Sequence, residues 1–547
     1  MKKILRYAML CAAAVSIIGC DINKEPYEAQ TADTIQGSPD GVEVATFGNY
    51  AKLKSWTDNW YRVIEYGSDD VALSGTTTDN LFYSYNYQHI PTNYRTNNFW
   101  NASYQIIGGT NKIITGVTEG ESPKFDQYLG ENYYLRAMIY FYLTNVFGRP
   151  YYQGESNLSV PLKLDNDYLN FPPRATVGEV YNQIVDDLTK AASLMTEDKA
   201  NAYASKEAAN ALLSRVYLYM REYDKAIEHA NKVIDSGKYS LVSTNDIGVY
   251  PRINPDNNNE TIFTIKHLAD IDYESNGWYT IGSMYANFQG SGWGEMYASS
   301  SFLRLVRQYP EDQRNNFIDP VENGSGEMWA LYVDDNTNYA HKVISYDEDT
   351  DNYFYDNAGT TTYLTKSTNE YGNTEYFLEE GGKSYSAFIQ EAMTDRNGYP
   401  KFYILKCSGQ DEQAHLWSPV ISRLAEVYLN KAEANAHLGN DTEALADINM
   451  IRERAGIPTE GLYSEGNLPT GKSVVDVVLE ERRLELAWEG HRKFDIFRNG
   501  LTLDRNYPGT HLTGAEPLYE VPATHPRVVD YIPESQRLIQ GNLEQNP

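Results

Sequence analysis

Cysteine is scarce in this chain, and no internal disulfide framework is expected. The 547 residues include three cysteines, and two of them, Cys11 and Cys20, stand close to the N-terminus. Cys407 is left without an internal partner, so the fold depends on a packed core rather than on cross-links. Because Cys407 follows a strand-like apolar segment at 401–405, we expect its thiol to be packed rather than reactive.

Long apolar runs and positive charge are also in short supply. After residue 20, no run approaches the ~20 apolar residues that a transmembrane helix needs. Acidic residues outnumber basic ones by 75 to 46, which gives a formal net charge of −29 at pH 7. A surface of this charge repels phosphate backbones, so we expect no nucleic acid as a partner.

The sequence patterns of common catalytic and metal sites are missing as well. The nine histidines are scattered, and there is no H-E-x-x-H, no G-x-S-x-G and no Cys/His metal spacing. We therefore expect no catalytic residue, no metal ligand and no cofactor. A phosphate-loop pattern, G-x-x-x-x-G-K-S, occurs at 466–473, but no apolar strand precedes it as phosphate binding requires. We interpret it as a loop in which Ser473 caps the next helix together with Asp476.

Residues 347–351 resemble the start of a calcium loop. However, Asn352 stands at the sixth position, where glycine is needed, and Ala358 at the twelfth, where glutamate is needed. A solvated acidic turn is the expected structure, with a weak extracellular calcium site as the alternative.

The segment 480–498 holds enough carboxylates to raise the hypothesis of glycoside hydrolysis. Opposite charges recur three or four positions apart on an expected helix, as in Arg482 with Glu485, and in Glu485 and Glu489 next to Arg492. Carboxylates paired in this way stay ionised, whereas a general acid needs a raised pKa. We interpret the segment as a structural ion-pair network with these members: Glu480, Glu481, Arg482, Arg483, Glu485, Glu489, Arg492, Asp495 and Arg498.

The first residues have the pattern of an export signal. Lys2, Lys3 and Arg6 precede an apolar run at 7–18, which ends in Gly19 and Cys20. This is the pattern of a bacterial lipoprotein signal, in which the cysteine is acylated and the chain is cut before it. We expect residues 1–19 to be removed, Cys20 to carry the lipid, and the polar stretch 20–40 to be a tether; the alternative is an ordinary secretory signal that is cut elsewhere.

Helical patterning dominates the remainder. Apolar residues recur at helical spacing in 135–146, which stops before Gly148, and again in 176–194. Residues 208–237 read as a helical hairpin, and 427–451 repeat its pattern approximately. Small residues in both units allow close stacking, so the sequence predicts a mainly α fold with tetratricopeptide-like helix pairs.

The stretch 240–410 differs in character. It contains short strand candidates at 262–265 and 402–405 among loops rich in Gly, Asn, Asp and Tyr, and 345–385 is especially rich in turn formers. So much irregular sequence is typical of functional loops. We expect helices to form the scaffold and these loops to form the site.

Several segments resemble the SusD/RagB-like family. They are RLAEVYLNKAEA at 423–434, INMIRERAG at 448–456, EERRLELAWEGHRKFDIFR at 480–498, and shorter matches at 135–138, 147–148, 208–237, 260–263, 532–534 and 545–547. They occur in the family's order and span nearly the whole mature chain. The resemblance implies a lipoprotein on the extracellular side of the outer membrane. It would capture oligosaccharides and sit as a lid on a TonB-dependent, SusC-like transporter. It also implies one domain at 41–547, with a helical scaffold at 41–240 and 411–547 and a loop-rich insert at 240–410.

Aromatic side chains are the expected ligand contacts. The chain has 46 tyrosines, 17 phenylalanines and 8 tryptophans. A flat ring covers the C–H face of a sugar, while amides, carboxylates and arginine hydrogen-bond its hydroxyls. In the family, ligands lie over an aromatic arc drawn from loops in broadly three places, which here are 83–95, 278–288 and 329–332. The candidate glycan-binding residues are Tyr83, Tyr85, Tyr87, Asn93, Tyr94, Arg95, Trp278, Tyr279, Tyr285 and Trp329.

Trp100 and Trp293 are expected in the scaffold instead. Two alternatives from other classes of protein stay open. One is an exported glycoside hydrolase, and the other is an adaptor that uses its helical repeats to assemble a surface complex.

Overall fold

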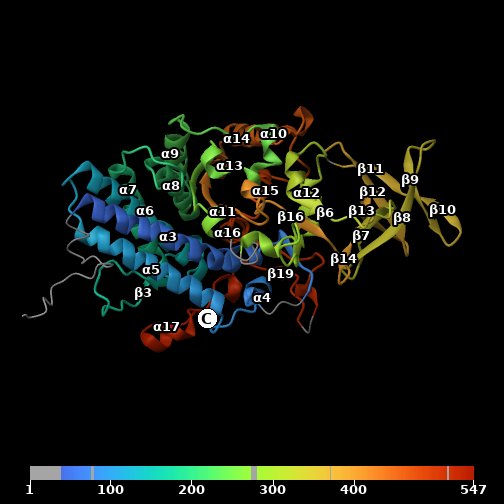
Figure 1. Cartoon of the computed structure of the whole chain (residues 1–547). Coiled ribbons are helices and arrows are strands. Elements are labelled where there is room, and N and C mark those ends of the chain that lie inside the picture. Colours follow the sequence, from blue (N-terminus) through green and yellow to red (C-terminus); the bar gives the residue numbers. More distant parts are fainter. Residues whose placement is uncertain (1–37, 76–78, 273–279, 370, 514–515) are drawn as a thin grey trace, which may run out of the picture.

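Helices form most of the protein in the computed structural model, which describes residues 38–75, 79–272, 280–369, 371–513 and 516–547. The predicted signal 1–19, the lipidation site Cys20, and Trp278 and Tyr279 lie outside the described residues. Figure 1 shows an elongated molecule with a helical body at one end and a β-sheet projecting from the other. The mainly α fold predicted from the sequence is confirmed.

Four long helices form one end of the body. They are α3 (Pro39–Ile64), α5 (Tyr94–Gly116), α6 (Pro123–Phe147) and α7 (Val177–Leu194). Helix α6 packs against α3, α5 and α7, and it is buried on nearly all sides. Its N-cap Ser122 accepts a hydrogen bond from the Phe125 backbone N–H at 3.2 Å, and it ends before Gly148, as the sequence predicted.

The predicted helix pairs are also present. Helix α8 (Lys206–Met220) pairs with α9 (Tyr223–Ile234), and α13 (Leu424–Leu438) pairs with α14 (Asp441–Arg454). Helix α13 also packs against α8 and α9, so the two pairs stack although they are far apart in the sequence. Buried alanines allow this close approach: Ala211, Ala226, Ala230, Ala432 and Ala444.

The capping prediction at Ser473 is confirmed. Helix α15 (Val474–Glu485) begins with a capping box, in which the Ser473 hydroxyl and the Asp476 carboxylate bond to each other's backbone N–H. A 3₁₀ turn at Thr459–Gly461 lies upstream where a phosphate loop would need a strand. The G-x-x-x-x-G-K-S pattern is therefore a helix start.

Short antiparallel strand pairs tie distant segments to the body. They join β1 (Val71–Leu73) to β5 (Met296–Ala298), β2 (Leu158–Pro161) to β3 (Arg174–Thr176), β4 (Thr261–Thr264) to β17 (Val420–Arg423), β6 (Ile318–Pro320) to β16 (Phe402–Ile404), β14 (Asp395–Arg396) to β15 (Tyr399–Pro400), and β18 (Leu503–Asp504) to β19 (Glu520–Val521). The strands expected at 262–265 and 402–405 are thus present, each ending one residue earlier. The remaining short helices are α4 (Leu81–Tyr85), α10 (Thr244–Ile247), α11 (Ala269–Asp272), α12 (Ser300–Val306), α16 (Arg492–Arg498) and α17 (Glu534–Ile539).

The projecting sheet has seven antiparallel strands in the order β10-β9-β8-β7-β13-β12-β11. Their bounds are β7 Met328–Val333, β8 Tyr339–Asp347, β9 Asn352–Asn357, β10 Thr360–Tyr363, β11 Thr365–Thr368, β12 Thr374–Glu380 and β13 Lys383–Glu391. The two-residue turns at Ala358–Gly359 and Gly381–Gly382 have positive φ at both positions, which is the geometry that twisted hairpins prefer.

This sheet curls on itself. Its edge strands β10 and β11 are joined by Leu364 alone, whose backbone N–H donates to the Tyr353 carbonyl at 2.9 Å. Across the curl, the Tyr355 hydroxyl donates to the Glu379 carbonyl at 2.8 Å. The side chains inside form a small core of their own: Ala330, Tyr332, Ile344, Tyr355, Leu364 and Leu378. The expectation of irregular loops at 345–385 is therefore wrong, because the turn formers join strands of one sheet.

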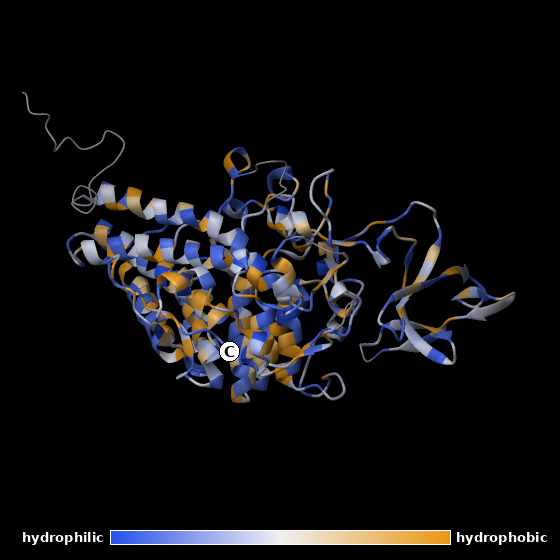
Figure 2. Ribbon diagram, turned by 90° about the horizontal axis from the view of Figure 1, so that it is seen from below, coloured by the Kyte–Doolittle hydropathy of each residue, from blue (hydrophilic) through white to orange (hydrophobic). Residues whose placement is uncertain are grey.

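The main core lies in the helical body, where apolar residues gather between the helices (Figure 2). Trp56 and Trp60 stack at 5.4 Å in its centre. Cys407 is fully buried, its Sγ atom lies 3.2 Å from the Tyr61 hydroxyl, and burial raises the pKa of its thiol, so the packed role is confirmed.

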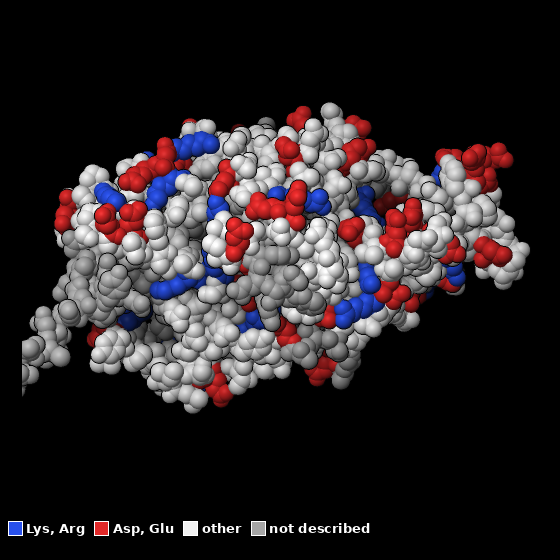
Figure 3. Space-filling model, viewed as in Figure 1, with Lys and Arg blue, Asp and Glu red and all other residues white. Residues whose placement is uncertain are grey.

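Acidic side chains are spread along the face shown in Figure 3. Within the described ranges, no helix combines the length and apolarity that crossing a membrane would need.

Candidate functional site

A partly buried network of two arginines and two aspartates lies where α3 meets the segment 79–95. The Arg95 guanidinium binds Asp58 at 2.8 Å and Asp79 at 2.5 and 3.0 Å. Arg62 binds Asp58 at 2.8 Å and lies 3.5 Å from Asp79. Each carboxylate therefore contacts both cations.

The network keeps the Asp79 carboxylate ionised. Burial would raise the pKa of Asp79, but hydrogen bonds from Arg95 and the charges of Arg95 and Arg62 outweigh burial and lower the pKa below its ordinary value. Carboxylates of this kind accept hydrogen bonds and do not act as general acids.

Two candidate aromatics border this network. Tyr94 is 41% exposed, and the Arg95 guanidinium lies 4.9 Å from the centre of its ring. Tyr83 is half-buried, and its ring packs edge-on against Phe82 at 5.9 Å. Both rings offer surface to a ligand, so their role in glycan binding stays a prediction.

A hollow of about 270 Å³ adjoins Asp58 of this network. It is lined by Lys54, Thr57 and Asp58 of α3, and by His267, Ile271, Asp272, Thr280, Ile281, Leu416 and Trp417. Lys54 binds Asp272 at 2.6 Å. Asp272 and Thr280 flank the segment that contains the predicted residues Trp278 and Tyr279, which the structure does not describe.

Three of the candidate tyrosines belong to the core, and for them the prediction of ligand contact is wrong. Tyr85 and Tyr285 have no exposed surface, and Tyr87 is 3% exposed. The Tyr85 hydroxyl bonds to the Leu73 backbone N–H at 3.0 Å and to His511, and the Tyr87 hydroxyl donates to the Gly67 carbonyl at 2.6 Å. The segment 83–95, which we expected to be a loop, contains α4, which ends at Tyr85, and the start of α5. Tyr87 follows α4 with φ +54°, and Tyr285 directly follows a 3₁₀ turn at Ile281–Met284.

Asn93 and Trp329 have structural contacts of their own. Asn93 is 1% exposed and caps α5, since its side-chain oxygen accepts from the Arg95 backbone N–H at 2.9 Å. Trp329 lies on β7 of the projecting sheet and stacks on His341, with ring centres 3.7 Å apart. Of the two scaffold tryptophans, Trp100 is buried as expected, whereas Trp293 is 36% exposed and does not belong to the core.

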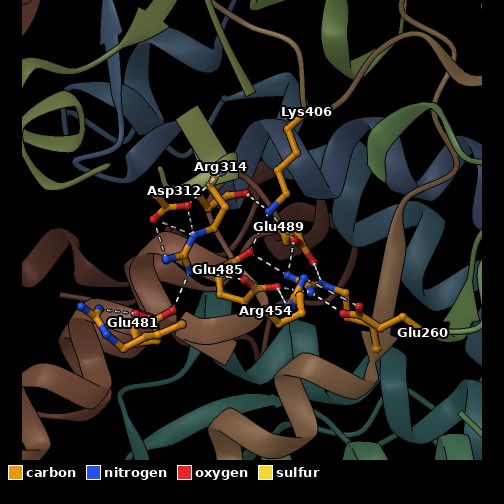
Figure 4. Close-up of polar contacts among 11 residues, drawn as sticks. Glu260, Asp312, Arg314, Lys406, Arg454, Glu481, Glu485 and Glu489 are labelled. Carbon is orange, nitrogen blue, oxygen red and sulfur yellow. Dashed lines mark hydrogen bonds and ion pairs between the residues drawn. The ribbon is translucent and has the colours of Figure 1, made fainter. Parts of the chain in front are cut away.

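The charged segment 480–498 forms a buried ion-pair network (Figure 4), as the sequence predicted. Arg423 binds Glu485 at 2.6 Å, Glu489 at 2.9 Å and Glu260 at 2.6 Å. Arg314 and Arg452 bind Glu481 at 2.6 and 2.9 Å. Nearby cations outweigh the effect of burial and lower the pKa of Glu485 well below its ordinary value and that of Glu489 to about 2. These carboxylates are ionised, which does not suit a general acid.

The partners differ from the predicted pairs. Arg482 binds Asp495 at 3.0 Å and Glu433 at 3.1 Å, and Arg492 binds Asp69 at 2.7 Å. Helix α15 ends at Glu485 and α16 begins at Arg492, so helical spacing does not extend across 486–491. The network is therefore built between elements rather than along one helix.

The acidic segment 347–351 forms the turn between β8 and β9. Asp351 has φ +48° and bonds to Tyr346 and Lys366, while Asp347 accepts from the Tyr363 hydroxyl at 2.5 Å and from the Asp349 backbone N–H at 3.0 Å. Within the described part of the chain, no three His, Cys, Asp or Glu residues lie close enough to hold a metal ion.

The sequence analysis missed several residues of the site, above all Asp58, Asp79 and Lys54. Asp58 and Arg62 are spaced by one helical turn on α3, which is a readable signal for a pair. Asp79 and Asp272 meet the other charges only through the tertiary fold.

The chain matches known proteins along most of its length. Residues 259–547 match the SusD family, and residues 31–218 match a family described as starch-binding associating with outer membrane. SusD-like proteins P2 and P38 of Formosa agariphila are 26% and 27% identical to it, over 88% and 74% of this chain and 88% and 75% of theirs.

Solved structures give the same result. A SusD superfamily protein from Bacteroides thetaiotaomicron is 26% identical, with a TM-score of 0.72 over 93% of this chain and 100% of that one. A SusD-like carbohydrate binding protein from Bacteroides vulgatus, 18% identical, shares the fold with a TM-score of 0.64 over 92% of this chain and 97% of that one. The resemblance found in the sequence motifs is confirmed, and the chain belongs to the SusD family.

Proposed function

We propose that this protein is a cell-surface lipoprotein that binds glycans and passes them to a TonB-dependent, SusC-like transporter in the outer membrane. Membership of the SusD family and the starch-binding description of the second matching family support this function. The proposed anchor is Cys20, and the proposed orientation is toward the outside of the cell.

The exposed ring of Tyr94 next to the network of Arg95, Asp58 and Asp79 carries the proposal. A sugar ring stacked on Tyr94 would present its hydroxyls to these groups, which include both donors and acceptors. The adjoining hollow of about 270 Å³ has room for part of a second unit. A binding module needs no more than this, because it holds its ligand without changing it.

Glycan binding is tested with the full-length protein, extracted in mild detergent, on a glycan array followed by calorimetric titration. Tyr94→Ala removes a stacking face worth on the order of 1 kcal/mol, so affinity should fall roughly fivefold. Tyr519→Ala is the matched control, since Tyr519 is 48% exposed and lies outside the site. Equal affinity of the two variants for the bound glycan would remove Tyr94 from the site.

The anchor is tested by Cys20→Ser, which should leave the protein unacylated and release it from membranes. A variant that stays in the membrane fraction would contradict the lipid anchor.

The transporter is tested by co-purification: the wild-type protein should bring down a co-expressed SusC-like protein.

The hydrolase alternative predicts turnover, and we expect none. Arginines lower the pKa of Asp79 beside Tyr94, and the pKa values of Glu485 and Glu489 in the segment 480–498, so these carboxylates are held ionised. Product release that tracks the purified protein, and that disappears when one Asp or Glu is replaced, would establish an enzyme instead.

A further inference from the structure

A second, larger cavity lies on the opposite flank of α3. It measures about 430 Å³ and is enclosed by α5, the β2–β3 connection and α17, which lie together at the lower left of Figure 1. It shares no lining residue with the hollow beside Asp58. Lys52 lines this cavity and Lys54 lines the hollow; two helix positions that are two residues apart point roughly 200° from each other. The two openings therefore lie on different sides of the molecule.

One face of α5 forms the floor of this cavity. Trp100, Tyr104, Gly108 and Lys112 follow each other at intervals of one helical turn and all line it. The rings of Trp100 and Tyr104 lie 4.9 Å apart, and the Tyr104 hydroxyl is fixed by a 2.8 Å bond to the Pro161 carbonyl. The lining also includes Tyr168 and Phe171, which are 82% and 49% exposed. Rigid aromatic surface thus borders open space.

Gly108 has no structural explanation in the packing. Glycine inside a helix costs about 1 kcal/mol relative to alanine. Its neighbour Gly109 is needed, because a Cβ there would lie 2.0 Å from Asn49 Oδ1 of α3. A Cβ at Gly108 would meet nothing within 4 Å, so no neighbouring atom requires glycine here, and the missing side chain leaves its space to the cavity.

The charge at this cavity is opposite to that of the protein as a whole. Lys52 donates only long hydrogen bonds, at 3.5 Å to Asn49 Oδ1 and to the Gln105 carbonyl, and no described carboxylate lies within ion-pair distance of its ammonium. Burial, and then the charge of Lys112, lower the pKa of Lys52. A third lysine of the lining, Lys163, is paired with Asp165. Two neighbouring cations in a chain of net charge −29 favour an anionic ligand.

We propose that this cavity binds a saccharide unit that carries an anionic group, either a carboxylate or a sulfate ester. The rings of Tyr104 and Phe171 would cover the C–H face of the sugar, with the buried Trp100 packed behind Tyr104, and the absent side chain of Gly108 leaves room for the sugar. Lys52 and Lys112 would hold the anion, and the amides of Gln105 and Gln536 lie within the same lining for hydroxyl groups. The choice of a saccharide rests on the proposed glycan-binding function.

The test compares three oligosaccharides of equal length by calorimetric titration of the detergent-extracted full-length protein: an oligogalacturonate, a sulfated galactan fragment and a neutral galactan fragment. At least one anionic probe should bind tenfold or more tightly than the neutral one, and added salt should weaken it. Which anionic probe binds separates the carboxylate from the sulfate ester.

Variants then locate the binding. Gly108→Trp fills the cavity and should weaken the anionic probe at least tenfold. Gly48→Trp is the matched control, because Gly48 is a glycine of α3 with equally open space and lies outside the lining. Lys52→Met should weaken the anionic probe severalfold and reduce its salt dependence without changing the neutral probe.

Three results would overturn the inference. The first is equal affinity of the protein for anionic and neutral probes. The second is a Gly108→Trp variant that binds the anionic probe as tightly as the wild type does. The third is a Gly108→Trp variant that still binds the probes but no longer co-purifies with the transporter, which would make the cavity a protein contact. Loss of binding in Tyr94→Ala together with unchanged binding in Gly108→Trp would refute this cavity alone. A protein that binds no glycan at all would refute the proposed function as well.

Discussion

Tyr85→Ala should destabilise the whole fold, whereas Tyr94→Ala should weaken glycan binding and leave stability almost unchanged. The two residues lie in the same short segment, but Tyr85 has no exposed surface and Tyr94 is 41% exposed. Burial lowers the pKa of His511 far below its ordinary value, so its ring is neutral. Its Nε2 atom lies 2.7 Å from the Arg505 carbonyl and must carry the proton, so Nδ1 accepts from the Tyr85 hydroxyl at 2.8 Å.

The expected magnitudes follow from these contacts. Emptying a packed aromatic position costs about 3–5 kcal/mol of the free energy of unfolding. Tyr85→Phe keeps the ring over which the Arg505 guanidinium lies at 4.5 Å, but it removes the partner of the Leu73 N–H and of His511. A buried polar group left without its partner costs about 1–3 kcal/mol, so this variant should fall between wild type and Tyr85→Ala. Tyr94→Ala should change stability by no more than about 0.5 kcal/mol.

The assay is urea unfolding of the full-length protein, followed by circular dichroism, with calorimetric titration of the bound glycan beside it. Tyr85→Ala should unfold at a clearly lower urea concentration than Tyr94→Ala. Coincident unfolding curves for the two variants would refute the assignment of Tyr85 to the core.

Three further predictions concern buried charge and close packing. Glu485→Gln should cost about 3–5 kcal/mol because it removes a buried negative charge that Arg423, Arg454 and Arg314 share. Since the pKa of Glu489 falls to about 2 in the folded protein, the stability from such carboxylates is complete above pH ~4.5 and should be lost as pH falls toward 2, which acid titration of the urea midpoint measures. His491 is buried, and burial, then the charge of Arg215, lower its pKa to about 4. The unfolded chain therefore binds the proton more readily, so stability should fall as pH is lowered from 6.5 to 4, and His491→Gln should flatten that decline of the urea midpoint; an unchanged decline would contradict a contribution from His491. Gly109→Ala should destabilise the protein because its Cβ meets Asn49 at 2.0 Å, whereas Gly108→Ala should stabilise it by up to about 1 kcal/mol. A Gly109→Ala variant that is more stable than Gly108→Ala in thermal unfolding would contradict the packing of α3 on α5.

The helical part of the fold was predictable because its signals are local. Helix ends are marked by residues that satisfy free backbone groups, such as Thr176 with Glu179 at the start of α7 and Gly439 at the end of α13. Apolar spacing then assigns the buried face. The approximate repeat of 208–237 in 427–451 predicted the two stacked helix pairs.

The projecting sheet was missed because its strands pair around turns that resemble loops. Gly381 and Gly382 mark a two-residue hairpin turn, and so do Ala358 and Gly359. Such turns, between segments rich in tyrosine and threonine, were a usable signal for adjacent antiparallel strands. The closure of the sheet through Leu364 is a tertiary feature that no local pattern contains.

Which aromatics face a ligand was only partly readable. Within α4, Leu81 and Tyr85 are one helical turn apart and both are buried, while Tyr83 lies on another side and is half-buried. Helical periodicity would have separated Tyr83 from Tyr85, had the segment been assigned to a helix. The partners of Arg95 are a different case, because Asp58 and Asp79 come from segments that only the fold brings together.

The motifs that identify the family are largely the motifs that build the buried charge network. Arg423 comes from the segment 423–434, Arg454 from 448–456, Glu260 from 260–263, and Glu481, Glu485 and Glu489 from 480–498. Charges in a dry interior need partners in fixed positions, so replacing one of them leaves another uncompensated. These residues therefore report the fold. The residues proposed to meet a glycan, Tyr94 and the lining of the cavity on α5, lie outside those segments, which is why the family is easier to establish from this sequence than the ligand.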